Sequence, residues 1–182
     1  MSRTDARIRY TQGVLKQALL SFLQEKPINK ITVKEVCERA ELNRATFYAH
    51  YSDCFALLES IEEDLLEAFQ QSLKLVASFD VTALIEAIYT MIEQQQEACR
   101  VLIFQNACPN VLRRMISLAR DKSIAYWKQH LHRVTEAELE MLYTHLSNGL
   151  MHVVVEGYEK YSREEVVRFV NRIVQCSLSQ FQ

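Results

Sequence analysis

One short stretch of the sequence combines a basic residue, aromatic residues and small polar residues at helical spacing. Residues 43–51 read NRATFYAHY. As a helix, this stretch would present a guanidinium, a methyl group, a hydroxyl and a phenol on one side. These groups belong to Arg44, Ala45, Thr46 and Tyr48. They suit base edges and phosphates, so the pattern predicts a helix that contacts the major groove of DNA.

The opposite side of this helix should hold it against the protein. Phe47 and Tyr51 are four residues apart, so they share a face that can pack inward. Asn43 is a favourable N-cap, and we therefore expect the helix over residues 44–50. Its first turn would leave backbone N–H groups that suit a phosphate oxygen.

A second short helix should precede this one. Thr32 and Glu35 have the spacing of a capping box, in which each side chain accepts a hydrogen bond from the other residue's backbone N–H. The box predicts a helix over residues 33–39, followed by a turn at residues 40–42. Two short helices joined by a tight turn form a helix-turn-helix.

The composition favours an all-α protein. The 182 residues are 49% apolar and include only three glycines and two prolines, so helix breakers are rare. Apolar residues recur with a helical period, and about nine helices are expected. Besides the two short helices, these should fall within residues 5–25, 53–76, 81–96, 97–105, 109–133, 138–160 and 166–181. The β-branched run 151–156 could be a strand, but its surroundings favour helix.

Charge is unevenly distributed along the chain. Residues 1–50 carry nine Lys or Arg and five acidic residues, a net charge of +4, whereas the remainder carries −6. A basic N-terminal part on an acidic body indicates that the first part meets a polyanion.

Several classes of protein are disfavoured. No apolar run is long enough to span a membrane, and residues 1–13 lack the apolar segment of a secretory signal. The five cysteines form no CxxC pair, which favours free thiols in a cytoplasmic protein. Cys54, at the start of a helix, could instead have a lowered pKa and be sensitive to oxidation.

Catalytic and metal-binding patterns are also lacking. No glycine-rich phosphate loop, GxSxG motif or Cys–His motif occurs, so we expect neither an enzyme nor a cofactor. His130 and His132 would point to different faces of a helix. His145 and His152 lie seven residues apart, too far for one small ion, so we expect no metal.

The segment ITVKEVCERAELNRATFYAHY, with ALLSFLQEKPINKIT before it and SDCFALLESI after it, resembles the DNA-binding domain of TetR/AcrR-family transcriptional regulators. The resemblance covers residues 7–66. The Thr-Phe-Tyr version of the motif and the later segment YEKYSREEVVRFV are most similar to the branch that includes the dihydroxyacetone kinase regulators. The resemblance implies a three-helix DNA-binding domain over residues 1–52. It also implies a larger helical domain for effector binding and dimerisation over residues 53–182.

The resemblance assigns roles to single residues. Thr32 would touch a phosphate, and Tyr48 and His50 would contact the DNA backbone, although His50 could also be a neutral surface histidine. The family usually has glycine at the position of Glu41 and lysine at that of Cys54. We therefore expect strain at Glu41 and weaker phosphate anchoring, which Lys34 or the N-terminal arginines could offset. The candidate DNA-binding residues are Thr32, Lys34, Asn43, Arg44, Ala45, Thr46, Tyr48 and His50.

Two further surfaces are expected in the larger domain. Apolar stripes on the last two helices exceed what one neighbour can cover, and Gly149 and Gly157 would allow close approach, so these helices should form a dimer interface. The candidate interface residues are Leu146, Leu150, Val153, Val154, Val166, Phe169, Val170 and Ile173. An effector pocket follows from the family resemblance, with Tyr89, Phe104, Met115, Trp127, Tyr143 and Met151 as candidate lining residues, each of which could be ordinary core.

Together these features predict a homodimeric regulator that binds a palindromic operator in double-stranded DNA. We expect a repressor that an unknown small molecule releases. The main alternative is a helical co-regulator that keeps this fold but binds a partner protein instead of DNA.

Overall fold

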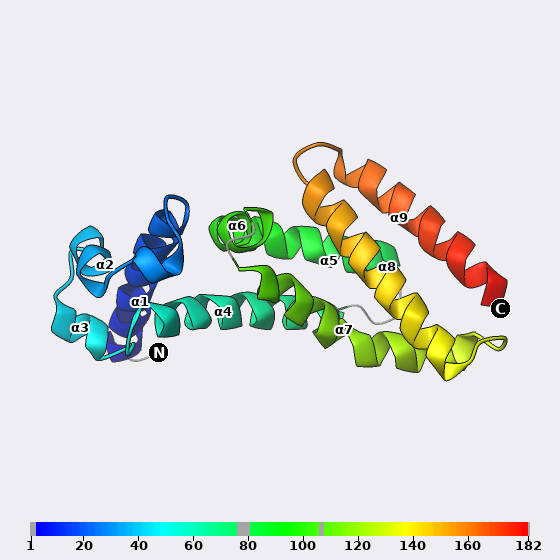
Figure 1. Ribbon diagram of the computed structural model, residues 1–182, viewed down its shortest axis with the longest axis horizontal. Coiled ribbons are helices and arrows are strands. Elements are labelled where there is room, and N and C mark those ends of the chain that lie inside the picture. Colours follow the sequence, from blue (N-terminus) through cyan, green and yellow to red (C-terminus); the bar gives the residue numbers. More distant parts are fainter. Residues whose placement is uncertain (1–2, 76–80, 106–107, 182) are drawn as a thin grey trace. The chain divides into compact units, whose positions relative to one another are not determined.

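The protein is built from helices. The structure, a computed structural model, describes residues 3–75, 81–105 and 108–181, which contain nine α-helices and no strand (Figure 1). The helices are α1 (Arg3–Leu23), α2 (Val33–Arg39), α3 (Arg44–Tyr48), α4 (Cys54–Leu75), α5 (Val81–Gln94), α6 (Gln96–Cys99), α7 (Pro109–His130), α8 (Glu136–Gly157) and α9 (Arg163–Leu178). The predicted all-α class and helix number are confirmed, and residues 151–156 lie inside α8.

Helix boundaries follow the capping residues in the sequence. Capping boxes begin α2 at Thr32, as predicted, α8 at Thr135 and α9 at Ser162, each with a Glu three residues later. Pro109 begins α7, where its missing N–H costs no hydrogen bond.

Some boundaries differ from the prediction. Helix α3 ends at Tyr48 rather than at residue 50, and α5 ends at Gln94. The predicted short helix over residues 97–105 is divided into α6 and a π-helical turn, Arg100–Phe104. Val76, expected in the long helix, lies outside the described residues.

The chain divides into two compact units. Unit 1 comprises Met1–Leu65 and Glu97–Cys108, and unit 2 comprises Leu66–Gln96 and Pro109–Gln182. Unit 1 therefore contains α1 to α3 and residues 97–108. The functional boundary expected between residues 52 and 53 stays a prediction, since these units are defined by packing alone.

Each unit has its own apolar core. In unit 1, Leu19 of α1, Val36 of α2 and Phe47 of α3 are fully buried, so the short helices are held by side chains rather than by their own length. In unit 2, Met115 of α7 and Val154 of α8 are fully buried. There α7 packs along α8, and α9 packs on both α5 and α8.

Within the described ranges, no helix combines the length and hydropathy needed to cross a membrane. No group of three potential metal ligands occurs among the same residues.

Candidate nucleic-acid interface and ligand cavity

Helix α3 is short, and local contacts fix its position. The Asn43 side-chain oxygen accepts hydrogen bonds from the backbone N–H and the hydroxyl of Thr46, at 2.7 and 3.0 Å. Phe47 is fully buried, and its ring meets the rings of Tyr48 and Tyr51 at centroid distances of 5.6 and 6.0 Å. The aromatic contacts and the N-cap therefore orient a helix of only five residues.

The outward face of α3 carries the predicted groove-facing groups. Arg44 and Ala45 are exposed, and 57% of Tyr48 is exposed. Thr46 and His50 are half-buried, and the Thr46 hydroxyl is used in the cap. The structure thus brings Arg44, Ala45 and Tyr48 onto one exposed face and places Thr46 at its edge.

Arg44 differs from Lys16, Lys26 and Arg39 of unit 1 in having no ion pair with a described residue. The Lys16 ammonium lies 2.5 Å from the Asp64 carboxylate, and the Lys26 ammonium lies 2.6 Å from Glu35. The Arg39 guanidinium lies over the Phe22 ring at 3.8 Å. Those three cations stabilise packing, whereas Arg44 remains available to an anion.

The start of α2 supplies two more candidate residues. The Thr32 hydroxyl donates to the Glu35 carboxylate at 2.8 Å and accepts from the Glu35 N–H at 3.3 Å, and the residue is exposed. Lys34 is exposed and forms a 3.8 Å ion pair with Glu38. Hydrogen bonds from Lys26 and Thr32 lower the pKa of the Glu35 carboxyl to about 2.

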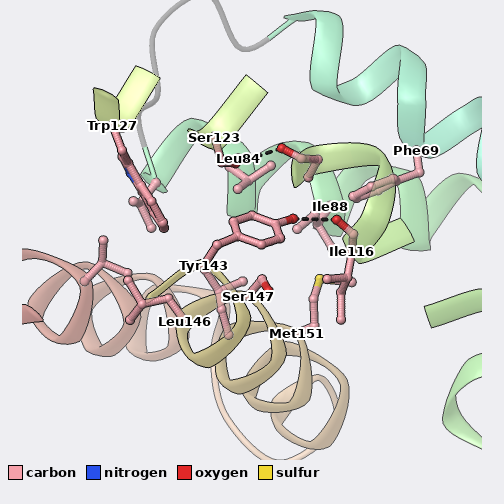
Figure 2. Close-up of a pocket in the computed structure, with 14 residues that line it drawn as sticks. Phe69, Leu84, Ile88, Ile116, Ser123, Trp127, Tyr143, Leu146, Ser147 and Met151 are labelled. Carbon is pink, nitrogen blue, oxygen red and sulfur yellow. Dashed lines mark hydrogen bonds between the residues drawn. The ribbon is translucent and has the colours of Figure 1, made fainter. Parts of the chain in front are cut away.

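A cavity lies among α5, α7 and α8 of unit 2 (Figure 2). Of the six residues predicted to line an effector pocket, Trp127, Tyr143 and Met151 line it. Leu146 and Leu150, predicted for the dimer interface, also line it. The remaining lining residues are Phe69, Val81, Leu84, Ile88, Ile116, Ala119, Ser123, Ser147 and Val174.

The other three candidate pocket residues lie elsewhere. Met115 is fully buried in the core, and Phe104 belongs to unit 1. The buried Tyr89 ring packs on Tyr158, at 5.4 Å between centroids, and under the Arg163 guanidinium. Sequence reasoning missed Ser123 and Ser147, because serines on an amphipathic helix usually face water.

The candidate dimer residues separate by burial. Leu146, Val154, Val166 and Val170 are buried within the chain, and Leu150 and Val153 are half-buried. By contrast, 45% of Phe169 and 42% of Ile173 is exposed. An apolar groove between α8 and α9 is lined by His145, Gly149, Val153, Phe169 and Ile173.

The two glycines of α8 also differ. At Gly157 a Cβ atom would lie 3.3 Å from a Val166 methyl group, so the close approach is to α9 of the same chain. At Gly149 a Cβ atom would meet no described atom within 4 Å. Only Gly149 is thus open to another molecule.

Comparison with known proteins shows which fold this chain shares. No protein-family model matches the chain. An uncharacterised HTH-type transcriptional regulator of Bacillus subtilis, YxbF, is 37% identical over 62 residues, which are 34% of this chain and 16% of that protein. A TetR transcriptional regulator from Streptococcus agalactiae superposes with a TM-score of 0.68 at 23% identity, over 94% of this chain and 97% of that one. The chain has the fold of the TetR-family regulators.

Two more solved structures share the TetR-family fold. The dihydroxyacetone kinase operon activator DhaS superposes with a TM-score of 0.63 at 16% identity, over 94% of this chain and 98% of that one. A transcriptional regulator from Pseudomonas aeruginosa gives a TM-score of 0.64 at 16% identity, over 94% of this chain and 93% of that one. The branch suggested by the sequence is thus among the structural relatives.

The first departure from the TetR-family pattern lies in the turn of the helix-turn-helix. Glu41 has a φ of 53°, in the left-handed region expected for the usual glycine. The Leu42 N–H donates to the Cys37 carbonyl at 3.0 Å, and the Glu41 N–H donates to the Glu38 carbonyl at 3.3 Å. This Schellman motif closes α2 with a residue that has a Cβ atom.

The second departure lies at the start of α4. Asp53 caps the helix through a 2.8 Å hydrogen bond from the Ala56 N–H. Cys54 is 4% exposed, and burial raises the pKa of its thiol to about 11. The hypothesis of a reactive thiolate at Cys54 is therefore wrong, because burial outweighs the helix terminus. A neutral buried thiol also cannot replace the phosphate-binding lysine of the TetR-family pattern.

Proposed function

We propose that this protein is a homodimeric DNA-binding transcriptional regulator of the TetR family. One observation carries the proposal: α3 buries Phe47 completely while it presents Arg44, Ala45 and Tyr48 outward. A helix that served only to pack against its neighbours would not require an exposed guanidinium, methyl group and phenol side by side. A helix that reads base edges and phosphates needs these groups.

A dimer follows from the small size of this face. Three or four side chains on one α3 contact too few base pairs for a specific site, and a two-fold pair of heads can read a palindrome. The exposed Phe169 and Ile173 beside the open Gly149 supply a surface that a second copy could cover.

Control by a small molecule is proposed from the cavity and α4. Helix α4 runs from residue 54 to residue 75, with its first part in unit 1 and its second part in unit 2. Phe69 of α4 lines the cavity. A ligand that binds one position of α4 better than another would shift the spacing of the two heads and change operator affinity.

The proposed sign of regulation is repression, relieved by the ligand. DhaS, which shares the fold, is described as an operon activator. A reporter gene behind the operator separates the two signs, since deletion of a repressor raises expression and deletion of an activator lowers it.

Binding to the DNA upstream of the protein's own gene tests the proposal. Fluorescence anisotropy should give saturable binding that a scrambled fragment of equal length does not compete away at moderate salt. Binding that is absent or independent of sequence would reject direct operator recognition. It would favour the alternative, a co-regulator that acts through a protein partner.

A further inference from the structure

The cavity of unit 2 has a lining that restricts the chemistry of its ligand. Its volume is about 60 Å³, several times the roughly 10–15 Å³ that one water molecule needs. Among the described residues, no Asp, Glu, Lys, Arg or His lines it. The walls are hydrocarbon and aromatic, apart from the Trp127 indole and three hydroxyl groups (Figure 2).

Two of the three hydroxyl groups are already used by the protein. The Ser123 hydroxyl donates to the Ala119 carbonyl at 2.8 Å, and the Tyr143 phenol donates to the Ile116 carbonyl (Figure 2). Burial raises the pKa of the Tyr143 phenol to about 12, so this group stays neutral. Neither group can supply a charge to a ligand.

The third hydroxyl group belongs to Ser147, one turn after Tyr143 on α8. Its oxygen is fully buried and makes no hydrogen bond of normal geometry to a described residue. Its hydroxyl is near enough to the Tyr143 phenol for a weak, poorly directed hydrogen bond, which opposes the rise in the pKa of Tyr143. A buried hydroxyl whose hydrogen bonding is incomplete is costly, and a ligand atom that hydrogen-bonds to it with good geometry would recover that cost.

The charged groups that act on Tyr143 cannot neutralise an ionic ligand. Arg120 also acts on the pKa of Tyr143, but its guanidinium already donates to the carboxylates of Glu140, at 3.1 Å, and Asp121, at 2.8 Å. An ion placed in this cavity would lose its hydration without gaining a partner.

We propose that the cavity binds a small, uncharged, largely hydrocarbon molecule, with one hydrogen-bonding group placed on the Ser147 hydroxyl. Alcohols, phenols and ketones of this size belong to the class, whereas carboxylates, phosphates and amines are excluded. The assignment of this molecule as the effector rests on the proposed function.

Trp127 provides a direct readout, because it is the single tryptophan of the chain and it lines the cavity. The three probes are toluene, benzyl alcohol and benzoate, each of which contains one benzene ring. Titration at neutral pH should change the Trp127 emission with toluene and benzyl alcohol. Benzyl alcohol should bind about 3- to 10-fold more tightly than toluene, the effect of one net hydrogen bond.

Two serine variants locate the polar contact. S147A should remove the preference for benzyl alcohol and leave toluene affinity unchanged. The matched control S123A should change neither, since that hydroxyl already donates to Ala119. Equal or tighter binding of benzoate, or no response to either neutral probe, would overturn the proposal in the unaltered protein. A preference for the alcohol that survives in S147A would overturn the role of Ser147.

The test separates ligand class from regulation. Probe binding is measured without DNA, and operator affinity is then measured with and without saturating benzyl alcohol. Binding that leaves operator affinity unchanged would reject the effector role but not the ligand class. Operator binding together with failure of both neutral probes would reject the ligand class and leave the regulator intact.

Discussion

Glu41 pairs an ordinary side chain with a backbone conformation that favours glycine. Its φ of 53° is the only positive φ among the described residues. The left-handed conformation costs a residue with a Cβ atom about 1–2 kcal/mol, which glycine would avoid. Part of that gain in stability is lost because glycine has more conformational freedom in the unfolded chain. We expect E41G to raise the free energy of unfolding by about 0.5–1 kcal/mol in urea denaturation.

The control for this prediction is E41A, which removes the carboxylate but keeps the Cβ atom. It should leave stability nearly unchanged. If E41A stabilises the protein as much as E41G, the effect comes from the charge rather than from the backbone, and the strain assigned to Glu41 is absent.

Residue types were enough to divide the inner and outer faces of α3. The pattern of Phe47 and Tyr51 against Arg44 and Tyr48 follows from helical spacing alone. The state of Cys54 could not be predicted in this way. Sequence places it at a helix start, where a pKa falls, but its burial depends on tertiary packing.

At the scale of elements, the capping box of α2 links stability to pH. Lys26 and Thr32 hydrogen-bond to the Glu35 carboxylate in the folded state, which lowers its pKa from 4.5 to about 2. A group whose pKa is lowered in the folded state contributes its full stabilisation at pH values above its unfolded-state pKa. This contribution is lost as the pH falls toward the folded-state pKa. Glu35 should therefore contribute to stability above about pH 4.5 and lose this contribution toward pH 2.

Urea denaturation from pH 7 to pH 2 checks the prediction with E35Q and E38Q. E35Q should be less stable at pH 7 and show a shallower loss of stability in acid than the unaltered protein. E38Q removes a carboxylate whose ion pair is long and exposed, so its pH profile should stay near that of the unaltered protein. Parallel profiles for E35Q and the unaltered protein would contradict the assigned role.

Helix existence was predictable because caps and apolar periods are local signals. The packing of residues 97–108 in unit 1 was not, since it depends on contacts distant in sequence. The Arg100 guanidinium donates to the Gln24 side chain at 3.0 Å, across 76 positions. No period in either segment indicates that they meet.

At the scale of the whole molecule, the exposed apolar residues of α9 should hold two copies together. F169E would place a charge in a buried interface and should convert the dimer into a monomer at micromolar concentration, as measured by light scattering. The control variant is L118E, which changes a similarly exposed apolar residue on α7. This variant should remain dimeric. A monomeric mass of about 21.2 kDa for the unaltered protein would reject the dimer itself.

The face predicted for dimerisation shows what sequence alone leaves open. Val154, Val166 and Val170 carry the same apolar signal as Phe169, but they are buried between helices of one chain. An apolar stripe that packs within the chain and an apolar stripe that packs against a second copy have the same helical period in the sequence. The structure leaves Phe169 and Ile173 exposed, and they define the surface to be tested.

We propose that α3 reads DNA through Arg44. The most direct measurement is the affinity of R44A for the upstream fragment and for a scrambled fragment, beside R133A, which removes an exposed arginine from unit 2. R44A should bind the upstream fragment about 10- to 100-fold more weakly, with a smaller loss on the scrambled fragment, because a base-edge contact is worth about 1–3 kcal/mol. R133A should bind like the unaltered protein. An R44A variant that is folded and binds the upstream fragment with unaltered affinity would show that α3 does not read DNA through Arg44.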